Sequence, residues 1–337
     1  MNVSERCKSL TKKLILSAGM LRAASAVRPR FIAILKYHSI RDDPDLVDDS
    51  IGSSIVHRTD VFREQMELVA RQFNPVTMDE VALFLRGQKE VPKWPVAVTF
   101  DDGYADNCEV AAPLLRRVGV PATFYVTVDA VDGAKAPWFV RVRHAIWTTK
   151  RNSWLDVESG RTLNLEKRED RISLMRRSCR RCASLTGHAQ EEAVRAIEAE
   201  LEAAPYRADG LMMSWGQIGS LQSDGHAIGS HTLSHPNVAH VSSQEMRVEL
   251  VESKRRLEGK LGVSVKHLSY PHPCLNPNFS AESTAVAREA GYATAVLSIN
   301  GPVSLDSDPM SMERLAVASD RHEFLWNLEC TLLGRRV

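Results

Sequence analysis

The chain has 337 residues, 44% of them hydrophobic, which is enough for one large domain or two modest ones. Its 43 basic and 42 acidic residues leave a net charge of +1, so no charge excess indicates nucleic acid as a partner. Six cysteines scattered over this length do not form the dense disulfide framework of a small secreted domain, which favours a reducing compartment.

Residues 1–30 form a basic, amphipathic segment ahead of the first predicted strand. Its apolar run, 14–21, is too short to span a membrane, and Arg22 follows it directly. Three interpretations stay open: a helix packed on the domain, a cleaved signal peptide, and a helix within residues 8–30 that lies on an anionic membrane surface. We expect a cytoplasmic protein, with peripheral contact at the inner membrane face through residues 8–30 as a further hypothesis.

The rest of the chain alternates between predicted strands and helices. Apolar runs predict strands at 30–40, 94–100, 122–128, 226–230, 265–270, 293–299 and 314–318. They show little apolar–polar alternation, as expected for strands buried on both faces. Helical patterns lie at 59–73, 77–87, 106–118, 214–224, 243–261 and 280–290. This order predicts an α/β fold with a parallel sheet, and seven or eight strands indicate a barrel with its chemistry at the carboxyl ends of the strands.

Residues 130–213 interrupt the alternation with long, polar helical patterns and no strand-like run. We interpret them as a helical insertion, either a solvated accessory bundle or a lid that recognises substrate. Cys179 and Cys182 lack a second pair and are expected to be ordinary helix residues. The arginines around them, at 176, 177, 180 and 181, indicate a solvated helix face, with contact to phosphate or lipid headgroups as the alternative.

Two adjacent carboxylates, Asp101 and Asp102, end the strand predicted at 94–100. Neighbouring strand residues point to opposite faces, so both can serve one site only if the chain turns there, which Gly103 permits. A divalent cation explains the pair, since it binds one carboxylate and keeps its neighbour ionised. The alternative is an ordinary Asp-Asp-Gly surface turn.

His231 and His235, four residues apart, follow the strand predicted at 226–230. In a barrel, the carboxyl ends of both strands open on one face, so these histidines can converge with Asp102. Three ligands of mixed oxygen and nitrogen type leave a position for water, as in a catalytic zinc-like site.

The segments "AVTFDDGYADNCEVAAPLLRRVGVPATFYV" (97–126) and "SWGQIGSLQSDGHAIGSHTLSHPNV" (214–238) resemble the polysaccharide deacetylases, carbohydrate esterase family four, which include chitooligosaccharide deacetylases. "KYHSI" (36–40) and "MERLAV" (312–317) extend the resemblance. It implies a distorted (β/α) barrel of about seven strands and places a catalytic domain at 31–337. It also implies metal-dependent removal of N- or O-acetyl groups from sugars.

The resemblance further implies a role for each matching residue. Asp102, His231 and His235 become ligands of a divalent metal, Zn²⁺ or alternatively Co²⁺, and Asp101 becomes the general base. Arg314 would orient Asp101 from behind.

The third and last signatures of the family are irregular here. In "SYPHPCLNP" (269–277), Tyr270 and Pro271 match and His272 replaces an aromatic; all three are predicted to bind substrate, with the His272 amide facing the oxyanion. The stretch "AVLSING" (295–301) lacks the expected acid histidine, so His38, His272 and Asp101 are all candidates for the proton donor. We expect His38 to be catalytic.

These observations predict a metal-dependent deacetylase whose substrate is an acetylated oligosaccharide or polysaccharide with N-acetylglucosamine-type residues. Two alternatives are an O-acetyl carbohydrate esterase and a non-catalytic glycan-binding protein with a degenerate site. The intact Asp/Asp/His/His set argues against the last, because a binding module needs no free base beside a metal.

Overall fold

The computed structural model describes residues 30–42, 55–132, 136–156, 160–206, 210–271 and 275–337, together with Lys12, Leu16 and Leu21. None of the helices in these ranges is both long and apolar enough to cross a bilayer. The Lys12 ammonium lies 5.3 Å from the ring centroid of Trp326. Most of segment 1–30 lies outside the described residues, so its predicted membrane contact stays a prediction.

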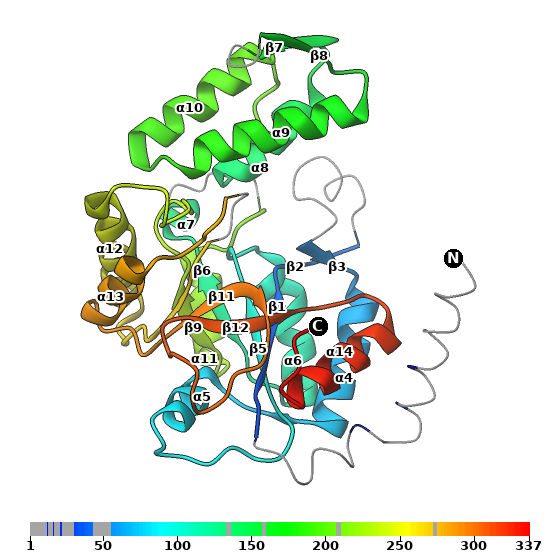
Figure 1. The fold of residues 1–337 in the computed structure, drawn as a ribbon, viewed down its shortest axis with the longest axis vertical. Coiled ribbons are helices and arrows are strands. Elements are labelled where there is room, and N and C mark those ends of the chain that lie inside the picture. Colours follow the sequence, from blue (N-terminus) through cyan, green and yellow to red (C-terminus); the bar gives the residue numbers. More distant parts are fainter. Residues whose placement is uncertain are drawn as a thin grey trace.

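Seven parallel strands close into a barrel, with helices packed around it (Figure 1). When the seven ring strands are taken in chain order, the first pairs with both the second and the seventh, which closes the ring. The predicted (β/α) barrel is therefore confirmed. In order around the ring the strands are β1 (Ala33–Tyr37), β5 (Pro95–Phe100), β6 (Thr123–Val126), β9 (Ala227–Ser230), β10 (His267–Ser269), β11 (Thr294–Asn300) and β12 (Met312–Ala316).

Short elements and irregularities surround this ring. β4 (Asn74–Pro75) adds to β5, and β2 (Ser39–Ile40) pairs with β3 (Val56–His57) as a separate ribbon. The pairing of β11 with β12 shifts register between Val296 and Asn300. That shift makes the barrel irregular at β12, the strand that carries Arg314.

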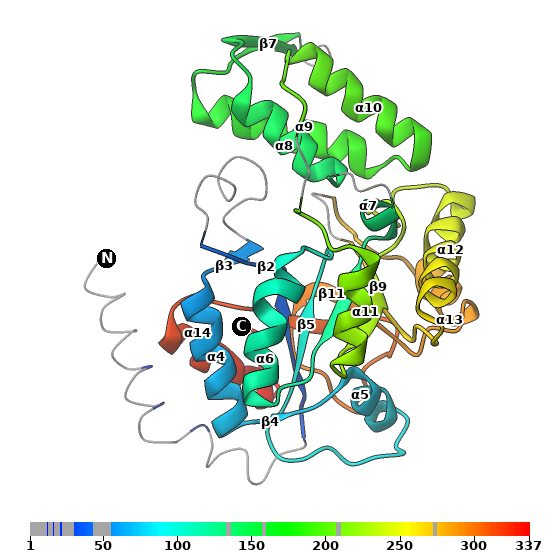
Figure 2. The same cartoon turned by 180° about the vertical axis from the view of Figure 1, so that it is seen from behind.

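The helices surround the barrel, as the two opposite views show (Figures 1 and 2). They are α4 (Thr59–Gln72), α5 (Met78–Leu85), α6 (Ala112–Val118, preceded by the π-helical turn η3 at Asn107–Ala111), α11 (Trp215–Ser223), α12 (Ser243–Leu261), α13 (Ala281–Glu289) and α14 (Arg321–Leu332). Helices α5, α11, α12 and α13 each begin with a reciprocal capping box. α12 ends at Gly262 in the left-handed conformation, which glycine adopts without strain. These local signals explain why the predicted helix boundaries agree with the observed ones.

Side chains fill the barrel interior, so the ring is not a pore. Tyr125 points inward opposite Gly229, where any Cβ would lie 2.4 Å from the tyrosine ring. Only glycine leaves room for that ring. The Arg314 guanidinium lies 5.9 Å from the Tyr125 ring centroid. A packed floor therefore lies beside the charged groups at the carboxyl ends of the strands.

The chain between β6 and β9 forms α7 (Val128–Asp132), α8 (Trp138–Thr148), the hairpin β7 (Ser153–Asp156) and β8 (Arg161–Asn164), α9 (Arg168–Ala183) and α10 (Gly187–Glu200). The expectation of an insertion without strands is wrong, because four-residue strands are too short to produce a recognisable apolar run. Cys179 and Cys182 of α9 are buried in the insertion's own core and form no disulfide within the described part of the chain, as their interpretation as helix residues requires. The insertion, green in Figure 1, lies past α7 on the side where β6 ends.

Candidate active site

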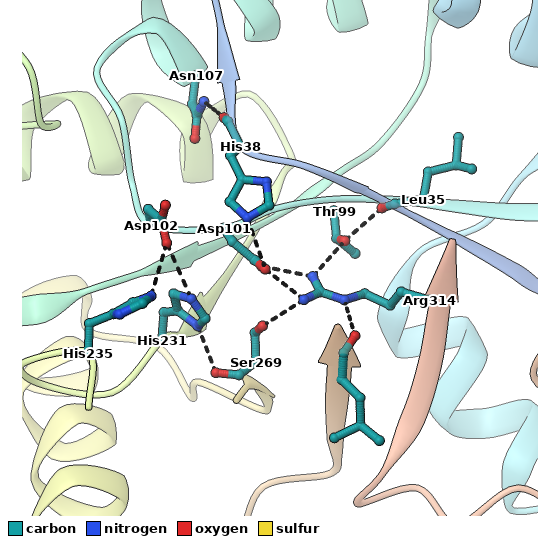
Figure 3. Close-up of polar contacts among 11 residues, drawn as sticks. Leu35, His38, Thr99, Asp101, Asp102, Asn107, His231, His235, Ser269 and Arg314 are labelled. Carbon is teal, nitrogen blue, oxygen red and sulfur yellow. Dashed lines mark hydrogen bonds and ion pairs between the residues drawn. The ribbon is translucent and has the colours of Figure 1, made fainter. Parts of the chain in front are cut away.

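The ends of β5 and β9 bring three ligand-type side chains together (Figure 3). Asp102 Oδ1 lies 3.4 Å from His231 Nε2 and 3.4 Å from His235 Nε2. One ligand atom from each residue lies within 4.8 Å of the others, and all three residues are buried. The convergence expected from two strand ends is therefore present in the structure.

The backbone turns sharply at both strand ends. Asp102 has φ +74° and Gly103 has φ +91°, so the turn that separates Asp102 from Asp101 uses the left-handed region twice. Thr232 and His235 also have positive φ, at 66° and 60°. Such conformations are uncommon for residues with a Cβ and persist only where surrounding contacts enforce them.

Contacts from α12 and α8 enforce the loop that carries His235. The buried carboxylate of Glu249 accepts the amides of Leu233 and Ser234, at 2.8 and 3.0 Å, and the Ser234 hydroxyl at 2.6 Å. Burial raises the pKa of Glu249, although these hydrogen bonds act in the opposite direction. Trp138 Nε1 donates to the His235 carbonyl at 3.1 Å, so the insertion contacts the site directly.

The hydrogen bond of His231 determines which of its ring nitrogens is available. His231 Nδ1 lies 2.7 Å from the carbonyl oxygen of Ser269, which can only accept, so Nδ1 carries a proton and the neutral form of the ring has its lone pair on Nε2. That lone pair faces the Asp102 carboxylate. His235 Nδ1 is buried and has no hydrogen-bond partner among the described residues.

This arrangement suits a cation. Burial raises the pKa of Asp102, but the contacts with His231 and His235 outweigh it and hold the pKa well below its ordinary value. In the neutral form of the two rings, the Nε2 lone pairs and the ionised carboxylate converge on one point, where a bound cation would take the place of the ring protons. The donor set fits a borderline ion such as Zn²⁺.

Asp101 has a separate partner. Arg314 donates to both of its carboxylate oxygens, at 2.8 and 2.6 Å, and has no solvent exposure. Thr99 Oγ1, Ser269 Oγ and the Leu297 carbonyl fix the rest of the guanidinium. Burial raises the pKa of Asp101, but the Arg314 charge opposes it and the net pKa lies below the ordinary value. The contact predicted between Arg314 and Asp101 is present.

Two more titratable groups lie on β1 and just beyond it. His38 Nε2 lies 4.0 Å from Asp101 Oδ2, and burial lowers the pKa of His38 to about 4. Lys36 is half-buried, and burial together with Arg314 lowers its pKa to about 8. Sequence reasoning missed Lys36, although its spacing of two from His38 on an apolar strand could have indicated it.

A comparison with known families decides the classification. The sequence pattern of the family described as "Polysaccharide deacetylase" matches residues 88–159 and 180–295, more than half of the chain. The chain belongs to the polysaccharide deacetylase family. It is therefore a hydrolase, in a family that deacetylates carbohydrate.

Individual relatives of this polysaccharide deacetylase are distant. "Putative polysaccharide deacetylase YxkH" of Bacillus subtilis (strain 168) is 21% identical over 292 residues, covering 86% of this chain and 73% of that protein. The structure of Streptococcus pyogenes deacetylase PplD in complex with acetate has a TM-score of 0.61 at 18% identity, covering 90% of this chain and 99% of that one. A de-N-acetylase from Aggregatibacter actinomycetemcomitans has a TM-score of 0.57 at 14% identity, covering 88% and 99%. At these identities the structural similarity shows a common fold.

The third signature of this polysaccharide deacetylase contributes through an unexpected residue. The Tyr270 ring is fully buried in the outer core, 6.2 Å from the Phe279 ring centroid, so its placement does not favour the predicted substrate contact. Pro271 is also buried. His272 lies outside the described residues, and its predicted roles stay predictions. Ser269 instead joins the two halves of the site, since its carbonyl contacts His231 and its hydroxyl accepts from Arg314.

Proposed function

We propose that this protein is a metal-dependent deacetylase that removes the N-acetyl group of N-acetylglucosamine-type residues in an oligosaccharide or polysaccharide. One observation carries the proposal: an ionised carboxylate, Asp101, is held by Arg314 directly beside a separate three-ligand cluster. A hydrolase needs both a group that activates an acyl carbonyl and a free base near the attacking water.

Asp102, His231 and His235 would hold the cation. A divalent ion bound there would polarise the acetyl carbonyl oxygen and lower the pKa of a bound water. Zn²⁺ is the ion that we propose first, with Co²⁺ as a substitute, because one carboxylate and two imidazoles match the ligand sets of catalytic zinc sites. The His231–Ser269 contact would orient the imidazole for this role.

The remaining residues would handle protons. Asp101 would accept a proton from the water while the water oxygen bonds to the acetyl carbon. Arg314 keeps Asp101 ionised for this step. The carbon–nitrogen bond would then break as the sugar nitrogen takes a proton, releasing acetate and an amino sugar. His38, 4.0 Å from Asp101, is the proposed donor: burial keeps its ring neutral at rest, so the ring can take up the proton that Asp101 received from the water and then pass it to the sugar nitrogen.

An O-acetyl esterase is the second candidate, because the same groups cleave esters. Amide cleavage depends on a proton donor more strongly than ester cleavage does, because the amine leaves poorly as an anion. The placement of His38 beside Asp101 therefore favours amide cleavage. The name of the Aggregatibacter neighbour, a de-N-acetylase, agrees with this choice. A pure glycan-binding function is disfavoured, because binding does not need a fixed, ionised base next to a ligand cluster.

We further propose a cytoplasmic location, with peripheral contact at the inner membrane face through residues 8–30. Among the described residues, four cysteines form no disulfide, which supports a reducing compartment; they are Cys108, Cys179, Cys182 and Cys330. Fractionation of the native host with an antibody against the chain tests this location, and recovery from the extracellular fraction would contradict it.

The test compares acetate release with metal binding. The protein is stripped with dipicolinate, reloaded with Zn²⁺ or Co²⁺, and incubated with N-acetylated chitohexaose and with O-acetylated xylan; acetate and the mass loss of one acetyl group are measured. The stripped protein should release no acetate from chitohexaose, and the reloaded protein should release it.

Three variants separate the proposed roles. Asp101→Asn should bind Zn²⁺ in calorimetry yet lose at least about 100-fold in rate. His231→Ala should lose the zinc, and Asp60→Asn, at an exposed aspartate, should change neither. Acetate release by the stripped protein, or an unimpaired Asp101→Asn variant, would contradict the mechanism. Release from xylan alone would assign the protein to the esterases.

A further inference from the structure

A cationic groove lies on the insertion, on elements that carry none of the proposed site residues. It has a volume of about 810 Å³, within the usual size of ligand pockets. Helix α9 lines it with Arg176, Arg177, Arg180 and Arg181, and Trp154 of β7 and Ile197 of α10 form apolar parts of its wall. We call these six residues the arginine groove.

The positive charge of the arginine groove is only partly compensated. Arg176 and Arg180, like Arg177 and Arg181, are four residues apart on one helix, so like charges face each other, which destabilises a helix on its own. Arg176, Arg180 and Arg181 are exposed and form no ion pair or hydrogen bond within the described part of the chain.

Other arginines of the insertion behave differently. Arg141 pairs with Glu191 and Glu198 at 2.7 and 2.6 Å. In the groove, the carboxylates among the lining residues are those of Glu169 and Glu200, and Glu200 already accepts the indole N–H of Trp154. The groove therefore keeps an excess of guanidinium groups that face one cavity.

The chemistry of the lining indicates the ligand. Guanidinium groups bind carboxylates and phosphates through paired hydrogen bonds. An indole beside them offers a flat apolar surface of the kind that a sugar ring can contact. A flat bilayer surface would leave the cavity between these side chains unfilled. We propose that the arginine groove binds an anionic segment of a polysaccharide chain, bearing carboxylate or phosphate groups, away from the residue being deacetylated. The identity of the ligand as a polysaccharide rests on the proposed function.

The test is a binding measurement that needs no catalysis. The zinc-loaded full chain is titrated by calorimetry with oligogalacturonate, phosphomannan oligosaccharide, neutral chitohexaose, phosphatidylglycerol vesicles and oligodeoxythymidylate. The variant is Arg176→Ser with Arg180→Ser. The matched control is Arg63→Ser in α4 with Arg86→Ser directly after α5, two exposed arginines that have no side-chain partner in the described residues.

We expect at least one of the two anionic oligosaccharides to bind the wild type, with affinity that falls as salt rises. The groove variant should weaken that binding at least about 10-fold, as expected when charge-assisted hydrogen bonds are lost, and the control should not. Hydrolysis of a short neutral substrate should be the same in all three proteins.

Several results would overturn the proposal. They are no binding of either anionic oligosaccharide, equal weakening by both double variants, or tighter binding of the vesicles or the oligonucleotide. A protein that releases no acetate from any substrate yet binds oligogalacturonate through the groove would refute the proposed function while leaving the groove intact, so the two failures are distinguishable.

Discussion

Arg314 donates to both carboxylate oxygens of Asp101, whereas the adjacent Asp102 faces His231 and His235 (Figure 3). The positive φ of Asp102 produces this division, because it turns one carboxylate away from the other at the end of β5. Two neighbouring aspartates thereby enter different environments. One pair of oxygens is occupied by a guanidinium, and the other is free to bind a cation.

Replacing Arg314 tests the dependence of Asp101 on this contact. Arg314→Met should lower kcat about 10- to 100-fold at unchanged zinc stoichiometry, because the base loses its orientation. It should also lower the free energy of unfolding by about 3–5 kcal/mol, since Asp101 stays buried without its partner. Arg314→Lys keeps the charge but not the paired donors, so its kcat and its free energy of unfolding should lie between those of the wild type and the methionine variant. Unchanged kcat per folded molecule in the methionine variant would exclude the positioning role.

Glu249 should control metal affinity without touching the metal ligands. Glu249→Gln removes one of the carboxylate oxygens that hold Leu233 and Ser234, so the loop that carries His235 should relax. We expect a loss of zinc affinity of about 10- to 100-fold, measured by competition with a chelating dye. Glu252→Gln, at a half-buried glutamate of the same helix whose carboxylate faces Arg255 and Arg256 and not the histidine loop, is the control. Equal zinc affinity in the Glu249 variant and the wild type would show that the loop keeps its shape without the carboxylate.

The role of His38 can be separated from that of Asp101 by choice of leaving group. His38→Gln should slow N-acetyl hydrolysis by about 100-fold or more, because the amine must be protonated as it leaves. Hydrolysis of 4-nitrophenyl acetate should change little, since nitrophenolate leaves without a proton. His322→Gln, at an exposed histidine of α14, should affect neither reaction. Equal losses on both substrates would assign His38 to another role.

His57 should make stability depend on pH. Burial lowers the pKa of His57 to about 4 from 6.5, so between these values the unfolded chain binds a proton that the folded protein does not. The contribution of His57 is therefore fully present above pH 6.5 and is lost as the pH falls toward 4, by about 2–3 kcal/mol.

The variant His57→Phe isolates this effect. It keeps a ring against Tyr37, whose centroid lies 5.1 Å away, and removes the titration. Denaturant unfolding at pH 7 and pH 4 should show a smaller loss of stability for His57→Phe than for the wild type. The same loss in both proteins would mean that His57 is protonated in the folded state.

Most of the barrel was predictable because its strands are buried on both faces. Runs such as 94–100 and 122–128 are continuously apolar, and they coincide with β5 and β6. Two elements were not predictable in this way. Trp154 and Leu155 lie among polar residues in β7, and the buried positions of α14, such as Phe324 and Glu329, are not confined to apolar residues in a single stripe.

The site divides along similar lines. Asp102, His231 and His235 follow strand ends, and strand ends meet in a barrel, so their convergence was predictable. Glu249 was not, because in the sequence it is one of several acidic residues of a charged helix and only its burial beneath the histidine loop distinguishes it. Ser269 was not predictable either, because its role depends on contacts with two distant segments: its carbonyl contacts His231 and its hydroxyl contacts Arg314.

The chain leaves the barrel after Val126 and returns at Ala227, on the very next strand of the ring. The two ends of the insertion are thus neighbours whatever its length, and a longer loop between fixed ends adds only about 0.6 kcal/mol of closure entropy for each doubling. Because β6 and β9 are paired, the insertion between them can become longer or shorter while every strand of the ring keeps its partner. Substitutions in the outer part of the insertion can therefore leave Asp101, Asp102 and the two histidines in place, as long as the contact of Trp138 with the His235 carbonyl is kept.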